Sequence, residues 1–315
     1  MKARIVLFIF CMIAIDIFAQ ENIVPHYPTV EEEKSMSEYL GLKKFYSSRS
    51  IPTPPPGPVR TMAEWEQIQA LIITWAGQTT ILKEIVRNAV RETKVLIITT
   101  NPSNVTSQLT SAGIPLDSVQ FVETPYNSIW VRDYGPWTVY KNDVDSLYLI
   151  DWIYNRPRAQ DDATPVAIAE FLNIPIYEAT VDPDDFVHTG GNHLPDGMGT
   201  AFSSMLVLEE NNDKTEAEID WIAKNYLGVN QYIKFPTLPF DGIHHLDMHM
   251  RILDEETIMF GEYPEGIADG PQINANIEYL LEEFQTAFGH PFRIIRIPMP
   301  PENNLYPDHG GDYRT

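Results

Sequence analysis

Cysteine is nearly absent from this 315-residue sequence, which contains one, Cys11. That residue lies in an N-terminal segment built like a secretory signal, with a basic start at Lys2 and Arg4, an apolar run over residues 5–18 and a small residue after it. We therefore predict a signal peptide over residues 1–19 and export of the remaining chain to the periplasm or the cell exterior. The alternative is a membrane anchor, but the run is shorter than the roughly 20 residues that a spanning helix needs. Cleavage would leave a chain that cannot form a disulfide, so its stability must come from packing.

Basic residues are scarce as well, with 22 Lys and Arg against 44 Asp and Glu, so the formal net charge is −22. This balance argues against nucleic acid as a partner, because binding of phosphates needs a basic surface. An acidic surface suits a well-solvated protein, or one whose small ligands are cationic. Beyond the predicted signal, the sequence has no apolar run long enough to cross a membrane and no glycine-rich phosphate-binding loop. We therefore expect no nucleic-acid partner, no membrane partner after cleavage and no nucleotide cofactor.

The first part of the mature chain, residues 20–60, has the composition of a lead segment rather than of a core. It contains three consecutive acidic residues at 31–33 and five prolines within 52–58. Such a proline run favours extended backbone and lacks amide donors, so we predict a linker or a strap on the surface. The folded domain is predicted over residues 61–315, starting at a Thr-x-x-Glu pattern at 61–64 that is typical of a capped helix start.

Apolar segments in the folded domain alternate between strand-like and helix-like spacing. Residues 70–75 have the pattern of a buried strand, and residues 81–90 place apolar side chains on one face of a helix. Further strands are expected at 95–98, 119–122, 146–150, 231–235, 248–253, 258–260 and 293–297, and further helices at 166–172, 216–226 and 273–288. This alternation predicts the α/β class, and a hydrophobic content of 43% is enough for a real core.

Residues 127–137 gather chemically active side chains directly after a predicted strand. The segment contains Trp130, Arg132, Asp133 and Trp137 beside a Gly-Pro turn. A local ion pair between Arg132 and Asp133, with both tryptophans in the core, would account for the pattern without any function. A binding role for Trp130 and Asp133 is the alternative.

Residues 188–193 contain the adjacent glycines Gly190 and Gly191, followed by Asn192. Adjacent glycines let a backbone approach a ligand closely, because no side chain stands between them. The Asp-Gly pair at 196–197 is equally typical of a hairpin turn.

Residues 243–250 place His245, Asp247 and His249 two positions apart. If the segment is a strand, the three side chains point the same way. Two histidines and a carboxylate on one face could hold a metal ion, or could form an acid–base histidine beside a carboxylate that binds a cation. A purely structural role is less favoured, since buried histidine and aspartate need partners.

Taken together, four motifs in this order resemble those of the bacterial Porphyromonas-type peptidylarginine deiminases and of their relatives, the agmatine deiminases. The motifs are Trp-x-Arg-Asp-Tyr at 130–134, Asn-Arg-Pro-Arg at 155–158, Thr-Gly-Gly-Asn at 189–192 and His-x-Asp at 245–247. The resemblance covers roughly residues 62–315. It implies the pentein fold, an α/β propeller of five ββαβ-like units around a pseudo-fivefold axis, with the last unit incomplete in this chain.

The resemblance also implies a reaction, the hydrolysis of a guanidinium group. Arginine would give citrulline and ammonia, and agmatine would give N-carbamoylputrescine, a step of putrescine biosynthesis, and ammonia. Asp133 and Asp247 match the two carboxylates that hold the guanidinium, and His245 matches the general acid and base. Trp130 would cover the flat face of the cation. The pocket wall would be formed by Gly190, Gly191 and Asn192.

The choice of substrate depends on Arg156 and Arg158. In the peptidylarginine branch, the matching arginines bind the carboxylate of a C-terminal arginine, which agmatine lacks. We therefore favour a peptidyl, C-terminal arginine as the substrate, with agmatine as the alternative. A structural explanation is that these two arginines pair with the nearby Asp161 and Asp162.

One feature of the family is missing from the sequence. The family attacks with a cysteine thiolate near its C-terminus and also supplies an asparagine there, and in this numbering both would lie beyond Thr315. A guanidinium carbon is a poor electrophile, so neither serine nor aspartate is an obvious replacement. We expect a C-terminally truncated domain that is catalytically silent as a 315-residue chain.

Two other hypotheses stay open. One is a metal-dependent hydrolase that uses His245, Asp247 and His249, whereas the deiminase hypothesis needs neither a metal nor a cofactor. The other is a non-catalytic protein that captures guanidino compounds. The resemblance favours the deiminase, with a small guanidino substrate or an arginine-containing peptide as its partner.

Overall fold

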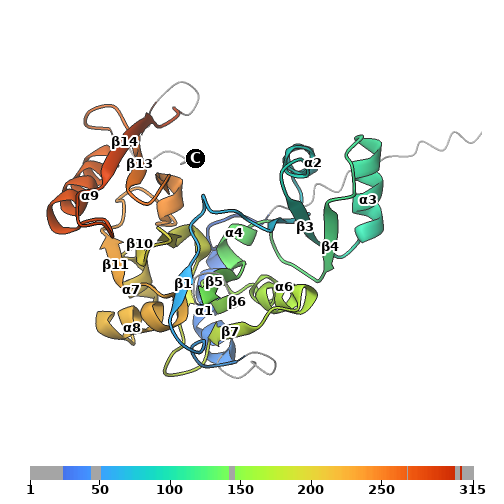
Figure 1. Cartoon of the computed structure of the whole chain (residues 1–315), viewed down its shortest axis with the longest axis horizontal. Helices are drawn as coiled ribbons and strands as arrows, with labels where there is room; N and C mark the ends of the chain where they lie inside the picture. Colours follow the sequence, from blue (N-terminus) through green and yellow to red (C-terminus); the bar gives the residue numbers. More distant parts are fainter. Residues whose placement is uncertain (1–23, 44–50, 142–145, 268, 302–305, 307–315) are drawn as a thin grey trace, which may run out of the picture.

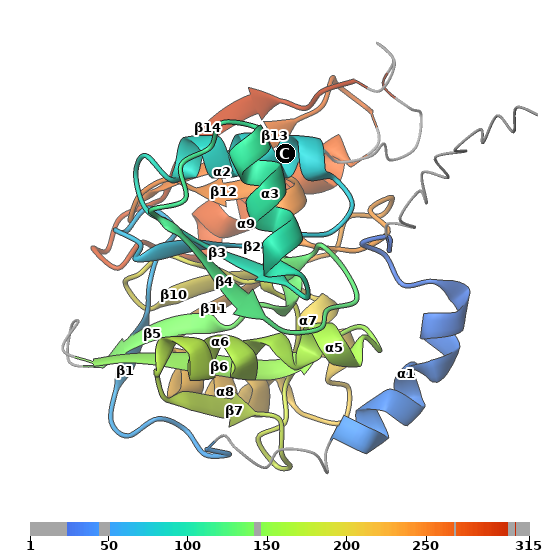
Figure 2. The same cartoon turned by 90° about the vertical axis from the view of Figure 1, so that its right-hand side faces the viewer.

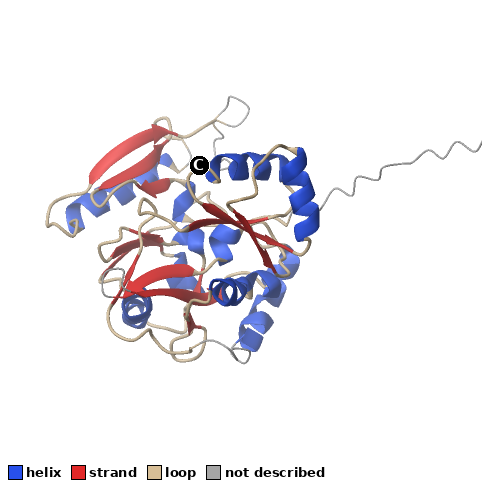
Figure 3. Ribbon diagram, turned by 45° about the vertical axis from the view of Figure 1, so that its right-hand side comes forward, coloured by secondary structure: helices blue, strands red, loops and turns tan. Residues whose placement is uncertain are grey.

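The computed structural model describes residues 24–43, 51–141, 146–267, 269–301 and 306. The predicted signal peptide, residues 1–19, lies outside this part. None of the helices in the described ranges has the length and apolar content needed to cross a membrane. Most helices lie on the outer side of the sheets, with the strands inside (Figure 3).

The first sheet is wholly parallel and stands at one end of the molecule (Figure 1). It consists of β2 (Ala70–Thr74), β3 (Lys94–Thr99) and β4 (Val119–Glu123), in that order. The crossovers are α2 (Thr79–Ala89) and α3 (Pro102–Ser111). The central strand β3 reads Lys-Val-Leu-Ile-Ile-Thr and is buried from its second residue onward, as expected for a parallel strand covered on both faces.

The second sheet begins with an antiparallel pair and continues with a parallel strand. β5 pairs antiparallel with β6, and β6 pairs parallel with β7 after the crossover helix α6. β1 extends the sheet antiparallel to β5, and β8 pairs with the far end of β6. The bounds are β1 (Val59–Thr61), β5 (Trp137–Lys141), β6 (Ser146–Tyr154), α6 (Thr164–Leu172), β7 (Ile176–Ala179) and β8 (Val187–His188).

The third and fourth sheets repeat the same β-β-α-β order. In each, an antiparallel pair is followed by a helix and a parallel strand. The third sheet has β9 (Leu194–Pro195), β10 (Thr200–Ser204), α8 (Glu216–Leu227) and β11 (Gln231–Phe235). The fourth has β12 (Met250–Ile252), β13 (Thr257–Glu262), α9 (Gly270–Glu283) and β14 (Arg293–Pro298).

The predicted α/β class is therefore confirmed. The described residues form four sheets, and these do not close into a ring. The five-bladed propeller that the resemblance implies stays an expectation.

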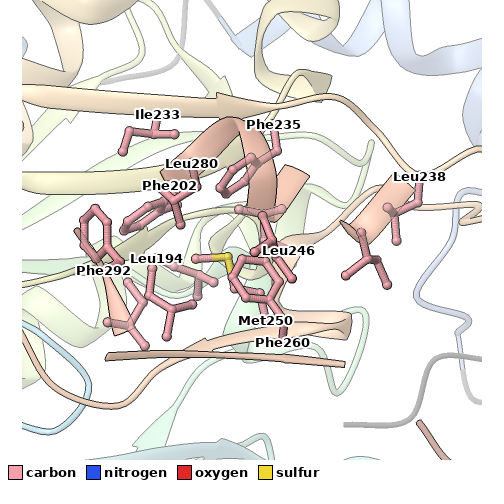
Figure 4. Close-up of a cluster of buried hydrophobic side chains, with 14 of the residues drawn as sticks. Leu194, Phe202, Ile233, Phe235, Leu238, Leu246, Met250, Phe260, Leu280 and Phe292 are labelled. Atoms are coloured by element: carbon pink, nitrogen blue, oxygen red, sulfur yellow. The ribbon is translucent and has the colours of Figure 1, made fainter. Parts of the chain in front are cut away.

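A shared apolar core joins the third and fourth sheets (Figure 4). Phe202 of β10 stacks on Phe235 of β11 with ring centres 6.0 Å apart, and Phe235 meets Phe260 of β13 edge-on at 6.2 Å. Leu280 of α9 is fully buried in the same cluster. Each such side chain contributes roughly 1.5–3 kcal/mol by leaving water.

The lead segment carries a helix that the sequence did not predict, α1 (Val30–Lys43). α1 lies along one side of the molecule, next to α5 (Ala159–Asp162), and the Tyr39 hydroxyl of α1 donates to the Asp162 carboxylate (Figure 2). The proline-rich part runs along the second sheet, where Ile51 forms a bridge with Tyr177 of β7.

The expected helix start at residues 61–64 is wrong. Thr61 is the last residue of β1, and its hydroxyl donates to the carbonyl oxygen of Leu227 instead of capping a helix. The chain pairs into the second sheet from Val59 onward.

Candidate active site

The short helix α4 (Val131–Tyr134) lies near the middle of the molecule, between the sheets (Figure 1). Its last residue, Tyr134, is buried. The Tyr134 hydroxyl donates to the carbonyl oxygen of Ser128 (3.0 Å) and shares a hydrogen bond with the Thr74 hydroxyl (2.6 Å). These contacts anchor the helical turn that carries Asp133.

The turn η2 (Gly190–Asn192) packs directly on α4. A Cβ atom on Gly190 would overlap the carbonyl oxygen of Arg132, so only glycine allows this approach. At the other end of the turn, the buried Asn192 side chain accepts a hydrogen bond from the Ser204 amide (2.8 Å) through its Oδ1 atom. Asn192 therefore joins η2 to β10 and supports the wall of the site.

Three polar side chains meet at Gly191. A Cβ atom there would lie 2.6 Å from His245 Nδ1, 2.8 Å from Asp133 Oδ1 and 3.0 Å from Asp247 Oδ1. These side chains come from segments more than a hundred residues apart in the chain. We call them the Asp133–His245–Asp247 cluster, and it contains all three catalytic candidates named from the sequence.

Hydrogen bonds hold the Asp133 carboxylate in place. Its Oδ1 atom accepts from the Thr189 hydroxyl (3.1 Å) and from the Gly191 amide (3.1 Å), and lies 3.4 Å from His245 Nδ1. Burial alone would raise the pKa of Asp133, but the charge of His245 and the hydrogen bonds from His245 and Thr189 keep that pKa below its ordinary value. Asp133 is therefore a carboxylate at neutral pH.

The pKa values of the other two members of the cluster, His245 and Asp247, are raised. Burial lowers the pKa of His245, but the charges of Asp133 and Asp247 and the hydrogen bond to Asp133 outweigh it, so the pKa is raised. The pKa of Asp247 is also raised, by burial and by the negative charge of Asp133, against the pull of His245. His245 Nε2 is buried and has no hydrogen-bond partner among the described residues. The cluster thus keeps an unused ring nitrogen beside two acidic side chains.

The segment that carries His245 and Asp247 is not a strand, so the condition under which the three side chains would share one face is not met. Leu246–Met248 forms a 3-10 turn, η3, and β12 starts only at Met250. His245 and His249 flank this turn, so the alternation of a strand does not describe their positions. His245 and Asp247 still reach Gly191 together, because the turn projects both toward η2.

His249, the third residue of the metal hypothesis, is buried, and its amide donates to the Leu246 carbonyl. Burial and the charge of Arg251 lower the pKa of His249 to about 3. In the part of the chain that the structure describes, no group of three or more His, Cys, Asp or Glu side chains is placed to hold a metal ion.

Asp247 already faces two guanidinium groups of the protein itself. Its Oδ2 atom lies 3.8 Å from Arg132 Nε and 3.8 Å from Arg251 Nη2. Arg132 also pairs with Glu64 and lies over the ring of Trp137, 5.5 Å from the ring centre. The expected ion pair of Arg132 with Asp133 is therefore replaced by pairs with Glu64 and Asp247.

The expected substrate-binding residues lie beside the N-terminal segment, residues 24–43. Trp130 Nε1 donates to the Val24 carbonyl (2.8 Å), and the Trp130 ring meets the His26 ring edge-on at 5.4 Å. Arg156 is buried and donates through Nε to the His26 carbonyl (3.4 Å). The charge of Arg156 influences both Asp133 and His245, so this arginine lies within electrostatic range of the cluster.

Arg158 is bound by the same segment rather than by its neighbours in sequence. Its Nε and Nη2 atoms donate to Glu32 Oε1 (2.7 Å) and Oε2 (3.1 Å). Asp161 accepts from the amides of Asn127 (2.7 Å) and Ser128 (3.0 Å). The hypothesis that Arg158 pairs with the neighbouring aspartates therefore missed its main acceptor.

One further acidic side chain near the cluster was not recognised from the sequence. Glu210 Oε1 accepts from Asn155 Nδ2 (2.7 Å), while Glu210 Oε2 is buried without a hydrogen-bond partner in the described part of the chain. Burial raises the pKa of Glu210 to about 7, although the hydrogen bond from Asn155 and the charge of Arg156 act against it. Glu210 is the second residue of a Glu-Glu pair at the end of a short helix, and the sequence around such a pair does not show whether its side chains are buried or exposed.

Residues 60–313 match the family model described as Porphyromonas-type peptidyl-arginine deiminase. By sequence, the chain is 27% identical over 199 residues to a protein of Vibrio parahaemolyticus that is provisionally named an agmatine deiminase. That alignment covers 58% of this chain and 53% of the relative, so the chain spans about half the length of that protein.

Solved structures show the same fold. The agmatine deiminase of Enterococcus faecalis matches with a TM-score of 0.69 and 20% identity, over 85% of this chain and 82% of that one. The agmatine deiminase of C. jejuni with substrate bound matches with a TM-score of 0.63 and 19% identity, over 77% of this chain and 74% of that one.

Proposed function

Because the chain belongs to the Porphyromonas-type peptidyl-arginine deiminase family, we propose that its Asp133–His245–Asp247 cluster binds the guanidinium group of a small cationic substrate. The observation that carries the proposal is the convergence of two acidic side chains and a histidine on Gly191. A guanidinium is planar and presents five donors in a fixed fork, and facing carboxylates accept such donors in pairs. The side chain of Trp130 would close the site with its flat ring.

Agmatine is better supported as the substrate than a peptide ending in arginine, which the sequence favoured. The relative and both solved structures named above carry the name agmatine deiminase. Agmatine has no carboxylate, and the principal carboxylate partner of Arg158 in this chain is Glu32, from the protein itself. Arg156 and Arg158 therefore no longer favour a peptide as the substrate.

Each member of the cluster has a part in guanidinium hydrolysis. Asp133, ionised at neutral pH, accepts from one side of the guanidinium, and Asp247 accepts from the other. With a nucleophile present, His245 would give a proton to the departing ammonia and take one from the attacking water, so that guanidinium and water yield a ureido group and ammonium. The covalent route of the family needs a thiolate, and the one cysteine of the sequence, Cys11, falls within the predicted signal peptide. We therefore expect the 315-residue chain to bind its substrate without turning it over.

Equilibrium titration with two ligands tests the proposal. Agmatine carries the guanidinium, and N-carbamoylputrescine has the same chain with a neutral ureido group. The 315-residue chain is expected to bind agmatine at least tenfold more tightly, because only the cation pairs with Asp133. Equal affinity for the two ligands would contradict the proposal. Release of ammonia from agmatine by the same preparation would contradict the expected lack of turnover.

We also propose that the chain is exported, which residues 1–19 support by their composition alone. Protein expressed from the full reading frame in a bacterium is expected to be recovered from the periplasm or medium with an N-terminus near residue 20. Retention of Met1 in the recovered protein would contradict export with cleavage.

A further inference from the structure

The N-terminal segment lies against all three residues that were expected to recognise the rest of the substrate. Backbone carbonyl oxygens of this segment accept from Trp130, Arg156 and Arg158. The helix α1 that follows is tied down at a second point, where Tyr39 donates to Asp162. The segment thus covers one side of the site and is held there from α1.

The contact between Glu32 and Arg158 has the geometry with which an arginine binds a free carboxylate. The two hydrogen bonds, Nε to Oε1 (2.7 Å) and Nη2 to Oε2 (3.1 Å), run side by side from one guanidinium edge to one carboxylate. Both side chains are largely removed from solvent, at 2% and 18% exposure. Arg158 also donates to the carbonyl of Pro25 (2.8 Å), so most of its donors are used within the segment.

A substrate carboxylate at this position would have to compete with Glu32. Arg158 Nη1 is buried and has no acceptor among the described residues, so the guanidinium keeps one nitrogen, with two N–H donors, that binds neither Glu32 nor the carbonyls. A carboxylate approaching that nitrogen meets the negative charge of Glu32 across the same guanidinium. A ligand without a carboxylate meets no such repulsion, because it places no negative charge there.

We propose that Glu32 is a specificity-determining residue, which fills the carboxylate position on Arg158 and so restricts the site to guanidino compounds without a carboxylate. This inference rests on the proposed binding of a guanidinium at the Asp133–His245–Asp247 cluster. It makes α1 part of the substrate selection, although α1 contributes nothing to the cluster itself.

The test compares two variants of the intact chain, Glu32→Gln and the control Glu31→Gln. Glu31 is the exposed neighbour on the same helix, so its variant changes the net charge equally without touching Arg158. Each protein is titrated with agmatine, with the dipeptide Gly-Arg and with Gly-Arg amide, which differs from the dipeptide by the loss of the carboxylate. Glutamine keeps the shape of the Glu32 side chain but loses its charge.

We expect Glu32→Gln to bind Gly-Arg at least tenfold more tightly than the unmodified chain does, which corresponds to about 1.4 kcal/mol. Its affinities for the amide and for agmatine should stay within twofold, and those of Glu31→Gln should not change. Tyr39→Phe, which loosens α1 and leaves Glu32 in place, should raise the affinity for Gly-Arg by a smaller factor.

The outcomes separate this inference from the proposed function. Unchanged agmatine binding in Glu32→Gln, together with an unchanged ratio of Gly-Arg to Gly-Arg amide, would overturn the role of Glu32 alone. Absence of agmatine binding to the unmodified chain would overturn the proposed function and, with it, this inference. Retained agmatine binding also reports that Glu32→Gln is folded.

Discussion

Gly191 has no side chain, and the space this leaves lets Asp133, His245 and Asp247 approach one another. Gly191 does not adopt a positive φ, so glycine is needed here for the space it leaves and not for its backbone conformation. An added Cβ atom would press on all three polar atoms at once, and these atoms belong to side chains that are themselves packed.

We predict that Gly191→Ala weakens agmatine binding by at least tenfold, because the cluster must open to admit the methyl group. The matched control is Gly242→Ala, since a Cβ atom there meets nothing within 4 Å. Isothermal titration of both variants measures the effect. Equal affinity of the two variants would contradict the convergence at Gly191.

Glu210 makes the stability of the folded protein depend on pH. Its pKa rises from an ordinary value of 4.5 to about 7 on folding, so the folded state binds the proton more tightly than the unfolded state does. The contribution of Glu210 to stability is therefore complete below pH 4.5, and it is lost as the pH rises through 7.

Glu210→Gln should remove this dependence, since glutamine does not titrate. The difference in free energy of unfolding between the variant and the unmodified chain is expected to change in favour of the variant by on the order of 1–3 kcal/mol as the pH rises from 4.5 to 8. Urea denaturation at several pH values measures the difference, with the exposed Glu209→Gln as control. A difference that does not change with pH would show that Glu210 titrates normally.

The members of the cluster could be named from the sequence because their motifs are local and ordered. The partners of the expected specificity residues could not, since Glu32 lies 126 positions from Arg158 and only the folded chain brings them together. The burial of Glu210 is equally invisible in the sequence, because a Glu-Glu pair looks the same in water and in a core.

Among the elements, the same four-residue pattern behaves differently at two places. Thr61-x-x-Glu64 forms no helix, because β1 pairs with β5 through Thr61. Thr215-x-x-Glu218 forms a complete capping box at the start of α8, with the Thr215 hydroxyl accepting from the Glu218 amide and the Glu218 carboxylate accepting from the Thr215 amide. Sheet pairing thus prevents the helix start at Thr61, whereas at Thr215 the same pattern caps a helix.

Thr215→Ala is expected to lower the free energy of unfolding by about 1 kcal/mol, the usual cost of losing a threonine cap. Thermal and urea denaturation measure this change, and agmatine affinity should stay within twofold because α8 lies outside the cluster. A loss of agmatine binding in a folded variant would mean that α8 supports the site more directly than its contacts indicate.

The turn at Leu246–Met248 is a second element whose form the local pattern left open. The alternating polar residues would share one face if the segment were a strand, yet Leu246–Met248 forms η3, and the expected strand at 248–253 is β12 (Met250–Ile252). The polar alternation does not register that η2 packs against this segment.

For the whole molecule, the α/β alternation along the sequence was sufficient to predict the class and most of the helices and strands. The arrangement of the sheets was not predictable in this way, because periodicity reports which face of a strand is buried and not which strand lies beside it. The repeated β-β-α-β order became visible only in the pairing of the last three sheets. The docking of α1 likewise depends on partners distant in the sequence, Arg158 for Glu32 and Asp162 for Tyr39.

In the proposed function the Asp133 carboxylate binds a guanidinium group, and titration of Asp133→Asn with agmatine tests this binding most directly. Asparagine keeps the acceptor for Thr189 and the Gly191 amide but removes the charge. We predict at least a 30-fold loss of affinity, roughly 2 kcal/mol or more, as for other buried charge pairs that lose one partner. The exposed control Asp117→Asn should bind as the unmodified chain does. Agmatine affinity in folded Asp133→Asn equal to that of the unmodified chain would contradict the account.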